Sequence, residues 1–242
     1  MTELALAAVL GAAFLAGVVD AMVGGGGLIQ LPALLTAFPS TAPPTLLGTS
    51  KLAGVFGTAS AAWRYSRSVS IPWRFVAPAG AIAFLASLGG AATVTHVPPD
   101  LFRPLVPVML TVVLVYTLAR KDLGAVHAPR RMSPGAIAAG LALVGAIGFY
   151  DGFFGPGTGS FLMLLLIRLY GFDFVNAAAS ARVLNVATNA SALAWFAGHG
   201  HVLWAVGLAM AVANVAGSQV GTRLALARGA GFVRGVFVAV VS

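Results

Sequence analysis

Four ionisable residues stand within otherwise apolar stretches of this chain. They are two carboxylates, Asp20 and Asp151, and two cations, Lys51 and Arg182. A charge at the centre of a membrane-spanning helix costs roughly 2.5 to 3.5 kcal/mol on insertion scales, so such groups pair with one another or face a water-filled cavity. Two cations that converge in such a cavity could bind a small oxyanion. Arginine adds a planar fork suited to carboxylate, sulfonate or sulfite oxygens.

Each carboxylate stands four residues before a glycine-rich run. The two segments read GVVDAMVGGGG at 17–27 and GFYDGFFGPGTG at 148–159. Glycine inside a helix costs roughly 1 kcal/mol relative to alanine, so both runs are predicted to interrupt a span. A helix restarting at Leu28 or Ser160 would direct free N–H groups and its positive dipole end into the protein, which is an anion site. The alternative is that these glycines only permit close helix packing.

The candidate substrate-binding residues are the two cations, the glycine runs, and the polar residues beside them or on the same helix faces. They are Lys51, Arg182, Gly24, Gly25, Gly26, Gly27, Gly155, Gly157, Thr158, Gly159, Thr49, Ser50, Asn185, Asn189 and Gln30. The hydroxyls next to the cations could instead cap helices. A further stripe of Asn214, Ser218 and Gly221 is assigned to helix packing.

Asp20 and Asp151 have two possible roles in such a site. They are candidates for proton coupling, or for counter-charges that neutralise the site when it is empty. An alternative is that Asp20 pairs with Lys51, and Asp151 with Arg182, only to hold the fold. The two readings are compatible with each other.

The composition is that of an all-α polytopic membrane protein. Of 242 residues 59% are hydrophobic and only 8% are charged, and the mean hydropathy is +0.95. The formal charge of +8 does not predict a nucleic-acid partner, because the 14 basic residues are spread across many apolar spans. There is no cysteine, and His199 and His201 have no further metal ligands nearby, so neither a cofactor nor a metal is expected.

An internal repeat runs through the chain at an offset of 131 residues, because 151 − 20 and 182 − 51 both equal 131. The same offset pairs Ser87 with Ser218 and Gly90 with Gly221 without a gap. Two homologous halves are therefore predicted: a first transmembrane repeat at 1–120, a basic cytoplasmic linker at 121–133, and a second transmembrane repeat at 134–242.

The expected spans follow this repeat. The two shortest, 28–38 and 159–169, cover about eleven residues and so about 16 Å of helix, which cannot cross a hydrocarbon core of about 30 Å. They are predicted to be half-helices buried within the protein. The others are 4–22, 47–64, 73–95, 103–119, 134–153, 175–197, 201–223 and a final piece from 231.

Loop charge predicts the orientation. The basic loops near 64–74, 120–132 and 223–234 are placed in the cytoplasm, and the loops near 38–45 and 198–201, without Lys or Arg, outside. The loops near 64–74 and 198–201 stand at nearly equivalent positions of the two halves, yet they fall on opposite sides of the lipid bilayer. The halves are therefore expected to be inverted about an axis in the membrane plane. A re-entrant hairpin that contributes no crossing would change this parity.

These segments resemble the sulfite exporter TauE/SafE family of membrane transporters. The resemblance rests on AGVVDAMVGGGGLIQLPALL and LGTSKLAGVFGTASAAWRY in the first half, and on GFYDGFFGPGTGSFLM, SARVLNVATNASALAWF and AGSQVGTRLA in the second. It implies movement of sulfite, thiosulfate, sulfoacetate or a related sulfonate or organic anion. The last segment, GFVRGVFVAVVS, is shorter than the family pattern, so a homodimer or a tilted helix would complete it.

The function predicted from these features is secondary transport of a small anion by alternating access, in the direction of export, across the cell's inner (plasma) membrane. An uncoupled anion channel is the alternative, since it needs the same cationic pore without coupling. A subunit of a larger transporter would need a partner that supplies energy. An enzyme is not expected, because the buried carboxylates accompany no histidine and no serine has an evident base beside it.

Overall fold

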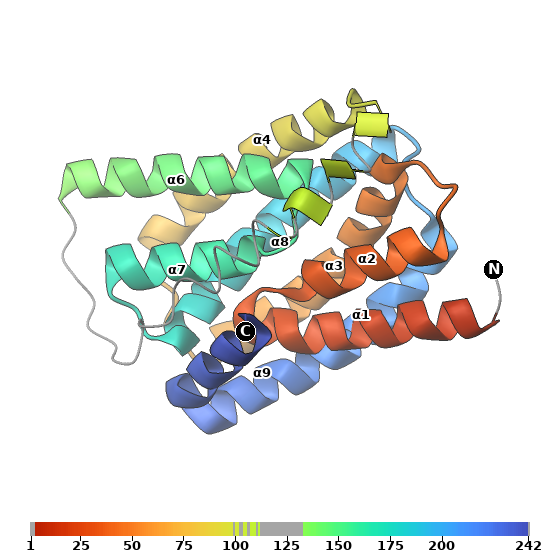
Figure 1. Ribbon diagram of the computed structural model, residues 1–242. Coiled ribbons are helices and arrows are strands. Elements are labelled where there is room, and N and C mark those ends of the chain that lie inside the picture. Colours follow the sequence, from red (N-terminus) through yellow and green to blue (C-terminus); the bar gives the residue numbers. More distant parts are fainter. Residues whose placement is uncertain are drawn as a thin grey trace.

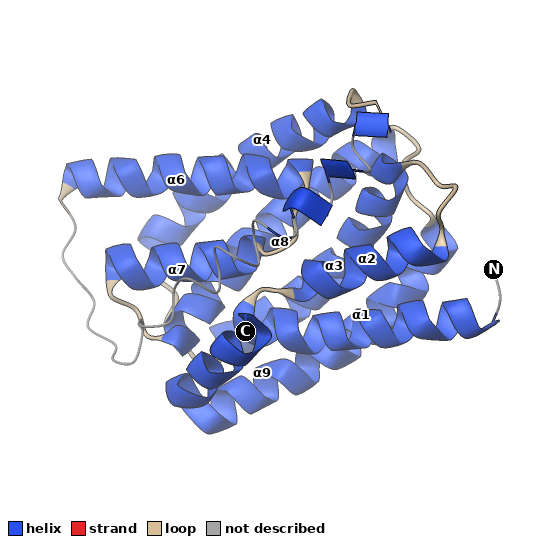
Figure 2. Cartoon of the chain, in the orientation of Figure 1, coloured by secondary structure: helices blue, strands red, loops and turns tan. Residues whose placement is uncertain are grey.

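The chain is built entirely of helices and connecting loops in the part described by the computed structural model, which comprises residues 3–98, 100–101, 104–105, 107–109, 111 and 133–241, with side chains as far as 237 (Figures 1 and 2). The predicted class, an all-α polytopic membrane protein, is confirmed. The span expected at 103–119 and the linker expected at 121–133 lie almost wholly outside the described residues.

The helices recur in the same order in the two halves. The first half contains α1 (Glu3–Val23), α2 (Gly26–Ala37), α3 (Pro43–Ser66) and α4 (Trp73–Thr95). The second contains α6 (Pro134–Phe153), α7 (Thr158–Tyr170), α8 (Phe174–Gly198) and α9 (Trp204–Val241). Adding 131 to the first residues of α1, α3 and α4 gives the first residues of α6, α8 and α9, so the sequence repeat is also a repeat of structure.

Both glycine runs interrupt a helix, as predicted. The backbone turns at Gly24 (φ 85°) in the first half, and at Gly155 (φ 98°) and Gly157 (φ 84°) in the second. These are left-handed conformations that glycine adopts without the steric cost of a side chain. The short helices α2 and α7 have 12 and 13 residues, and relative to the expected spans α2 begins two residues earlier and α7 one residue earlier. The result is two broken hairpins, α1–α2 and α6–α7, whose tips meet inside the molecule (Figure 1).

Four of the described helices are long and apolar enough to cross a membrane: α1, α4, α6, and α9 as far as Phe237. The central pair, α3 and α8, has 24 and 25 residues and so exceeds 30 Å in length, but carries the polar residues of the bundle. These polar side chains are buried against the other helices. The apolar helices therefore shield a polar centre.

Several contacts between the halves occur twice. If a residue of the first half contacts a residue of the second half, their two equivalents at the 131-residue offset also contact each other. The small-residue contacts of this kind are Gly17 with Asn214 and Gly148 with Ala83, and Gly90 with Phe149 and Gly221 with Val18. The hydrogen bonds of this kind run from Ser87 Oγ to Thr188 O (2.9 Å) and from Ser218 Oγ to Gly57 O (2.7 Å). A two-fold relation between the halves produces such exchange.

The central helices α3 and α8 run antiparallel. At one end Thr45 Oγ1 of α3 lies 3.3 Å from Nδ1 of His201, just beyond α8. Near the middle, Asn189 Nδ2 donates to Thr58 Oγ1 (3.5 Å). Thr58 and Asn189 are repeat-equivalent, since 189 − 58 = 131, so a two-fold relation between the halves would place their contact on its axis. The inverted repeat expected from the loop charges stays a prediction.

The two ends of the bundle differ in charge. At one end, Arg64 of α3 hydrogen-bonds Gln219 of α9, and the rings of Phe75 of α4 and Tyr170 of α7 are 4.3 Å apart. The arginines that follow α3, begin α4, end α7 and lie along α9 are gathered there. At the opposite end, loops 38–42 and 199–203 contain no Lys or Arg.

The last helix has a break near its end. Gly229 adopts φ 73° and ψ −172°, which separates the long part of α9 from a final segment, as expected from the sequence. That segment packs against the start of α8, where the rings of Phe174 and Phe237 lie 5.5 Å apart.

Candidate functional site

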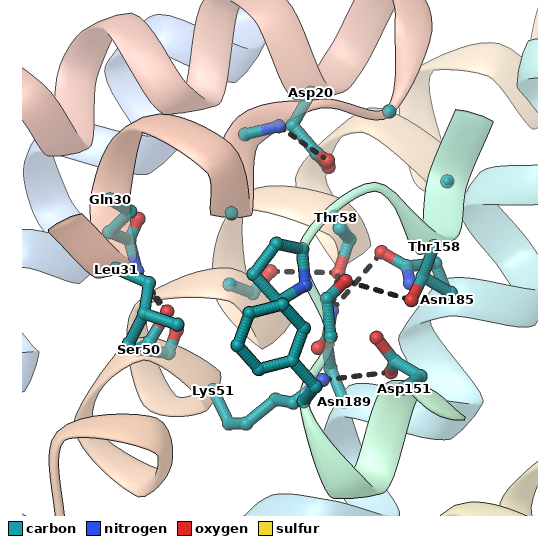
Figure 3. A pocket seen from close by; sticks show the side chains of 18 of the residues that line it. Asp20, Gln30, Leu31, Ser50, Lys51, Thr58, Asp151, Thr158, Asn185 and Asn189 are labelled. Atoms are coloured by element: carbon teal, nitrogen blue, oxygen red, sulfur yellow. Dashed lines mark hydrogen bonds and ion pairs between the residues drawn. The ribbon is translucent and has the colours of Figure 1, made fainter. Parts of the chain in front are cut away.

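A cavity of about 60 Å³ lies where the tips of the two broken hairpins meet the central helices (Figure 3). Both halves contribute to its wall. The predicted site residues that line it are Asp20, Gly24, Gly26, Gly27, Gln30, Ser50, Lys51, Asp151, Gly155, Thr158, Gly159, Asn185 and Asn189. Residues more than 130 positions apart in the sequence are therefore brought into one small space.

Two ion pairs join the halves beside this cavity. Lys51 Nζ lies 2.9 Å from Asp151 Oδ2, as Figure 3 shows, and Arg182 Nη1 lies 2.7 Å from Asp20 Oδ2. Arg182 Nη1 also donates to the backbone oxygen of Asp20. The alternative considered from the sequence, pairing of Asp20 with Lys51 and of Asp151 with Arg182 within each half, is wrong, because each cation pairs with the carboxylate of the other half. The two ion pairs are repeat-equivalent, like the helix contacts, because Arg182 is the equivalent of Lys51 and Asp20 is the equivalent of Asp151.

The N-terminal ends of α2 and α7 face the cavity. Neither is capped by a side chain, because the residues at their N-caps are Gly25 and Gly157. Gly26 N–H donates to Asp20 Oδ1 (3.4 Å), and among the described residues Gly27 and Gly159 have no partner for their N–H groups. Backbone donors and the positive ends of two helix dipoles are thus available to an anionic ligand.

The remaining wall is polar and internally hydrogen-bonded. On one side Gln30 Nε2 donates to the Ser50 hydroxyl and to its backbone oxygen, both at 3.0 Å. On the axis, Asn189 Nδ2 donates to Asn185 Oδ1 (3.3 Å) as well as to Thr58. These bonds orient the side chains before any ligand arrives, which reduces the cost of ordering them on binding.

Four predicted residues do not lie on the wall: Gly25, Thr49, Gly157 and Arg182. Thr49 Oγ1 donates to Thr45 O (2.6 Å) and accepts from the Leu203 N–H (3.0 Å), so it ties α3 to the loop before α9. Arg182 is completely buried behind the hairpin tips, where its Nη2 lies close to Gly159. Lys51 therefore lines the cavity, whereas its repeat equivalent, Arg182, does not.

The wall also contains residues that were not predicted as site residues: Leu31, Leu47, Gly54, Thr58, Phe154, Pro156 and Asn214. The assignment of Asn214 to helix packing was incomplete, because its Nδ2 donates to Gln30 Oε1 (3.0 Å) as well as to Ala13 O (3.1 Å). The sequence did contain a signal for this second role. The repeat equivalent of Asn214 is Ala83, so helix packing at this position does not require an amide side chain.

The charges around the cavity sum to zero, since two cations are matched by two carboxylates. A water needs roughly 10 to 15 Å³ of such a cavity, so about 60 Å³ holds about four to six waters or one small oxyanion. The described residues contain no group of three or more His, Cys, Asp or Glu placed to hold a metal ion. The site therefore presents backbone N–H donors and a lysine, which are groups that can bind a small anion.

Comparisons with known proteins show that the chain is similar to membrane transporters. The model of the sulfite exporter TauE/SafE family matches residues 9–242. A Sinorhizobium protein described as probable membrane transporter protein ORF9 is 39% identical over 229 residues, covering 95% of this chain and 86% of its own. The Escherichia coli (strain K12) probable membrane transporter protein YfcA is 37% identical over 230 residues, covering 94% and 83%. A Haemophilus influenzae probable membrane transporter protein is 34% identical over 226 residues, covering 93% and 87%. No solved structure matches the chain.

Proposed function

The chain belongs to the sulfite exporter TauE/SafE family, and we propose that it is a secondary transporter that exports a small sulfur oxyanion across the plasma membrane by alternating access. That it is a multi-pass membrane protein is established by its family and by its apolar helices. Its relatives are described as membrane transporters and not as enzymes, which fits the absence of a catalytic constellation from the predicted site.

One observation carries the proposal: the cavity lies between the halves, not within either. Lys51 and Asp151, one from each half, form an ion pair on its wall, and the N-terminal ends of α2 and α7 reach it from opposite hairpins. A site at the interface of two repeats, formed by interrupted helices, is where movement of one repeat against the other changes access from one side to the other.

The charge of the two ends supports an orientation. Cytoplasmic loops are enriched in Lys and Arg, so the arginine-bearing end lies in the cytoplasm and loops 38–42 and 199–203 lie outside. In this orientation the α1–α2 hairpin enters from the outside and the α6–α7 hairpin from the cytoplasm. The pseudo-two-fold axis then lies in the membrane plane.

The crossed pair on the wall provides a mechanism of coupling. In the empty site Asp151 neutralises Lys51 at 2.9 Å, so an arriving anion competes with a carboxylate for the same ammonium group. Protonation of Asp151 removes that competitor and adds one positive charge, which offsets charge on the bound anion. Anion and proton then cross together, so net export requires a sulfite gradient that exceeds the inward proton gradient. Sulfite and thiosulfate fit the cavity volume best among the anions implied by the family.

The direct test is sulfite efflux from proteoliposomes. Replacing Lys51 with Gln removes the cation on the wall, and we expect the efflux rate to fall at least tenfold. The double variant Lys51→Gln/Asp151→Asn, which leaves no unpaired buried carboxylate, should be equally slow. Arg74→Gln removes an exposed positive charge outside the cavity and serves as the matched control. Wild-type efflux by the Lys51 variants would refute the proposed site.

A second measurement separates a transporter from an anion channel. A proton-coupled transporter accumulates sulfite against its gradient when a proton gradient is imposed, whereas a channel only equilibrates it at the membrane potential. Accumulation that persists with the membrane potential clamped to zero is the expected result. Equilibration without accumulation would favour the channel.

A further inference from the structure

The cavity is one-sided with respect to the repeat. Four wall residues come from the N-terminal half of α3: Leu47, Ser50, Lys51 and Gly54. The equivalent of Gly54, Asn185, is also on the wall, but the equivalents of the other three, Ala178, Ala181 and Arg182, lie off it with 0% of their surface exposed. The space around α3 is thus open in this structure, and the corresponding space around α8 is closed.

The two hairpins also differ in conformation. In the α1–α2 hairpin the helices touch, since a Cβ added to Gly26 would lie 2.6 Å from the backbone oxygen of Ala16. In the α6–α7 hairpin the helices meet near the tip, where the Tyr150 and Phe161 rings are 5.5 Å apart. Along the rest of the hairpin an apolar cleft of about 550 Å³ lies between them, with Leu143 and Ile147 on one side and Leu165 on the other. Two units with the same order of helices therefore adopt different packing within one molecule.

The closed side contains a cation with unused donors. Nε and Nη2 of Arg182 have no hydrogen-bond partner among the described residues, although the side chain is completely buried. An unsatisfied buried donor costs about 1 to 3 kcal/mol, and more when it is charged. Nη2 also lies beside Gly159, at the positive end of α7. A hydrogen-bond acceptor that reached Nε and Nη2 would stabilise the guanidinium in this position.

The chemistry of the missing acceptor follows from the free edge of the guanidinium. Nε and Nη2 carry parallel N–H groups, which bind two oxygens of one oxyanion side by side. The other edge is occupied, because Nη1 is bonded to Asp20. The open side of Arg182 is therefore complementary to a sulfite or sulfonate group, the same class of ligand that fits the cavity beside Lys51.

We infer that Arg182 is the anion-binding cation of a second conformation, in which the halves exchange their packing and a mirror cavity opens toward the cytoplasm. The inference rests on the proposed transport function. Exchanging the conformations of two similar units preserves the kinds of contact made, so the second state lies close in energy to the first. In that state Ala178, Ala181 and Arg182 form the wall, and the space around Ser50 closes. The anion passes from the ammonium of Lys51 to the guanidinium of Arg182.

The absence of cysteine from the chain allows a direct test. Single variants Ser50→Cys and Ala181→Cys are placed in right-side-out and inside-out vesicles and treated with a membrane-impermeant charged maleimide. We expect Ser50→Cys to react from the outer face and Ala181→Cys from the cytoplasmic face only. Ala178→Cys provides a second reporter of the mirror cavity if Ala181→Cys fails to fold. Ala192→Cys, at a position buried in both halves, is the unreactive control.

The role of the guanidinium is tested by Arg182→Lys, which keeps the positive charge and the pair with Asp20 but removes the two-donor edge. Sulfite efflux should fall at least tenfold, while outer-face labelling of Ser50→Cys in the same background stays within twofold. Wild-type efflux by Arg182→Lys would overturn the inference. So would transport-competent Ala178→Cys and Ala181→Cys variants that never react from the cytoplasmic face. Failure of the wild-type protein to move any tested anion would instead refute the proposed function, whatever the labelling shows.

Discussion

Lys51 and Asp151 form the pair to which we assign anion recognition. They are in direct ionic contact on the cavity wall, and both are nearly buried, with 7% and 2% of their side-chain surface exposed. At such low exposure the attraction between them is screened little by solvent, so an anion must compete with Asp151 for Lys51. In the proposed mechanism, protonation of Asp151 removes that competition.

Replacing Asp151 with Asn removes the competitor while preserving the shape of the side chain. We expect sulfite to bind at least tenfold more tightly to Asp151→Asn than to the wild-type protein, because Lys51 then has no carboxylate partner. Calorimetric titration in buffers of different ionisation enthalpy reports the protons that accompany binding. The wild-type protein should take up about one proton per anion, and Asp151→Asn none.

Asp100→Asn is the matched control for this titration, because Asp100 is exposed and lies outside the cavity wall. Its affinity and its proton uptake should equal those of the wild-type protein. Proton uptake that persists unchanged in Asp151→Asn would show that another group carries the proton.

The residues of the site were largely predictable, but their partners were not. Aspartate, lysine and arginine stand out in apolar sequence, and glycine runs mark breaks, because both are local properties. The choice of partner is not local: a repeat of 131 residues is equally consistent with pairing within halves and between them. The burial of Arg182 was also beyond prediction, since it depends on how one half is packed relative to the other.

At the scale of the helices, the hairpin tips fix the position of the cavity. Gly24 and Gly159 make the closest approach between the two tips, and Gly24 adopts a left-handed conformation there. A side chain at Gly24 would overlap the backbone of the opposite hairpin. The glycine run is therefore required both for the break in the helix and for the contact between the halves.

Replacing Gly24 with Ala should damage both features. A left-handed backbone costs a residue with a Cβ about 1 to 2 kcal/mol, before the overlap with Gly159 is counted. We expect a fall of several degrees in the unfolding temperature of the detergent-solubilised protein, together with loss of sulfite binding. Scanning fluorimetry with and without sulfite measures both quantities.

Gly11→Ala is the control for this substitution, since no atom lies within 4 Å of the Cβ that it would add. Gly11 is a regular helical residue of α1, where alanine is favoured by up to about 1 kcal/mol. Its unfolding temperature should equal or exceed that of the wild-type protein. Equal stability of the Gly24 and Gly11 variants would contradict the assigned role of the tip contact.

At the scale of the whole molecule, we expect the volume of the cavity to limit which anions are transported. Sulfite has four non-hydrogen atoms and sulfoacetate has eight, whereas the cavity of about 60 Å³ holds about four to six waters. We expect sulfoacetate to compete with sulfite efflux at least tenfold more weakly than thiosulfate does. Competition assays in proteoliposomes measure this ranking.

Leu31→Ala tests whether the wall sets this limit. Leu31 lines the cavity, so its truncation should narrow the difference between sulfoacetate and thiosulfate. Leu34→Ala removes the same atoms from a buried position of the same helix that lies off the wall, and it should leave the ranking unchanged. An identical ranking in both variants would show that selection occurs elsewhere.

The crossed ion pairs have a consequence for the origin of the protein. A single short chain with one aspartate and one cation, associating with an identical copy about a two-fold axis, makes both bridges at once by symmetry. Duplication and fusion of its gene would then preserve every contact already present in the dimer. Divergence could follow afterwards, with one copy keeping lysine and the other arginine. The bridges between Lys51 and Asp151 and between Arg182 and Asp20 are the contacts that a two-fold dimer of single repeats would already have made.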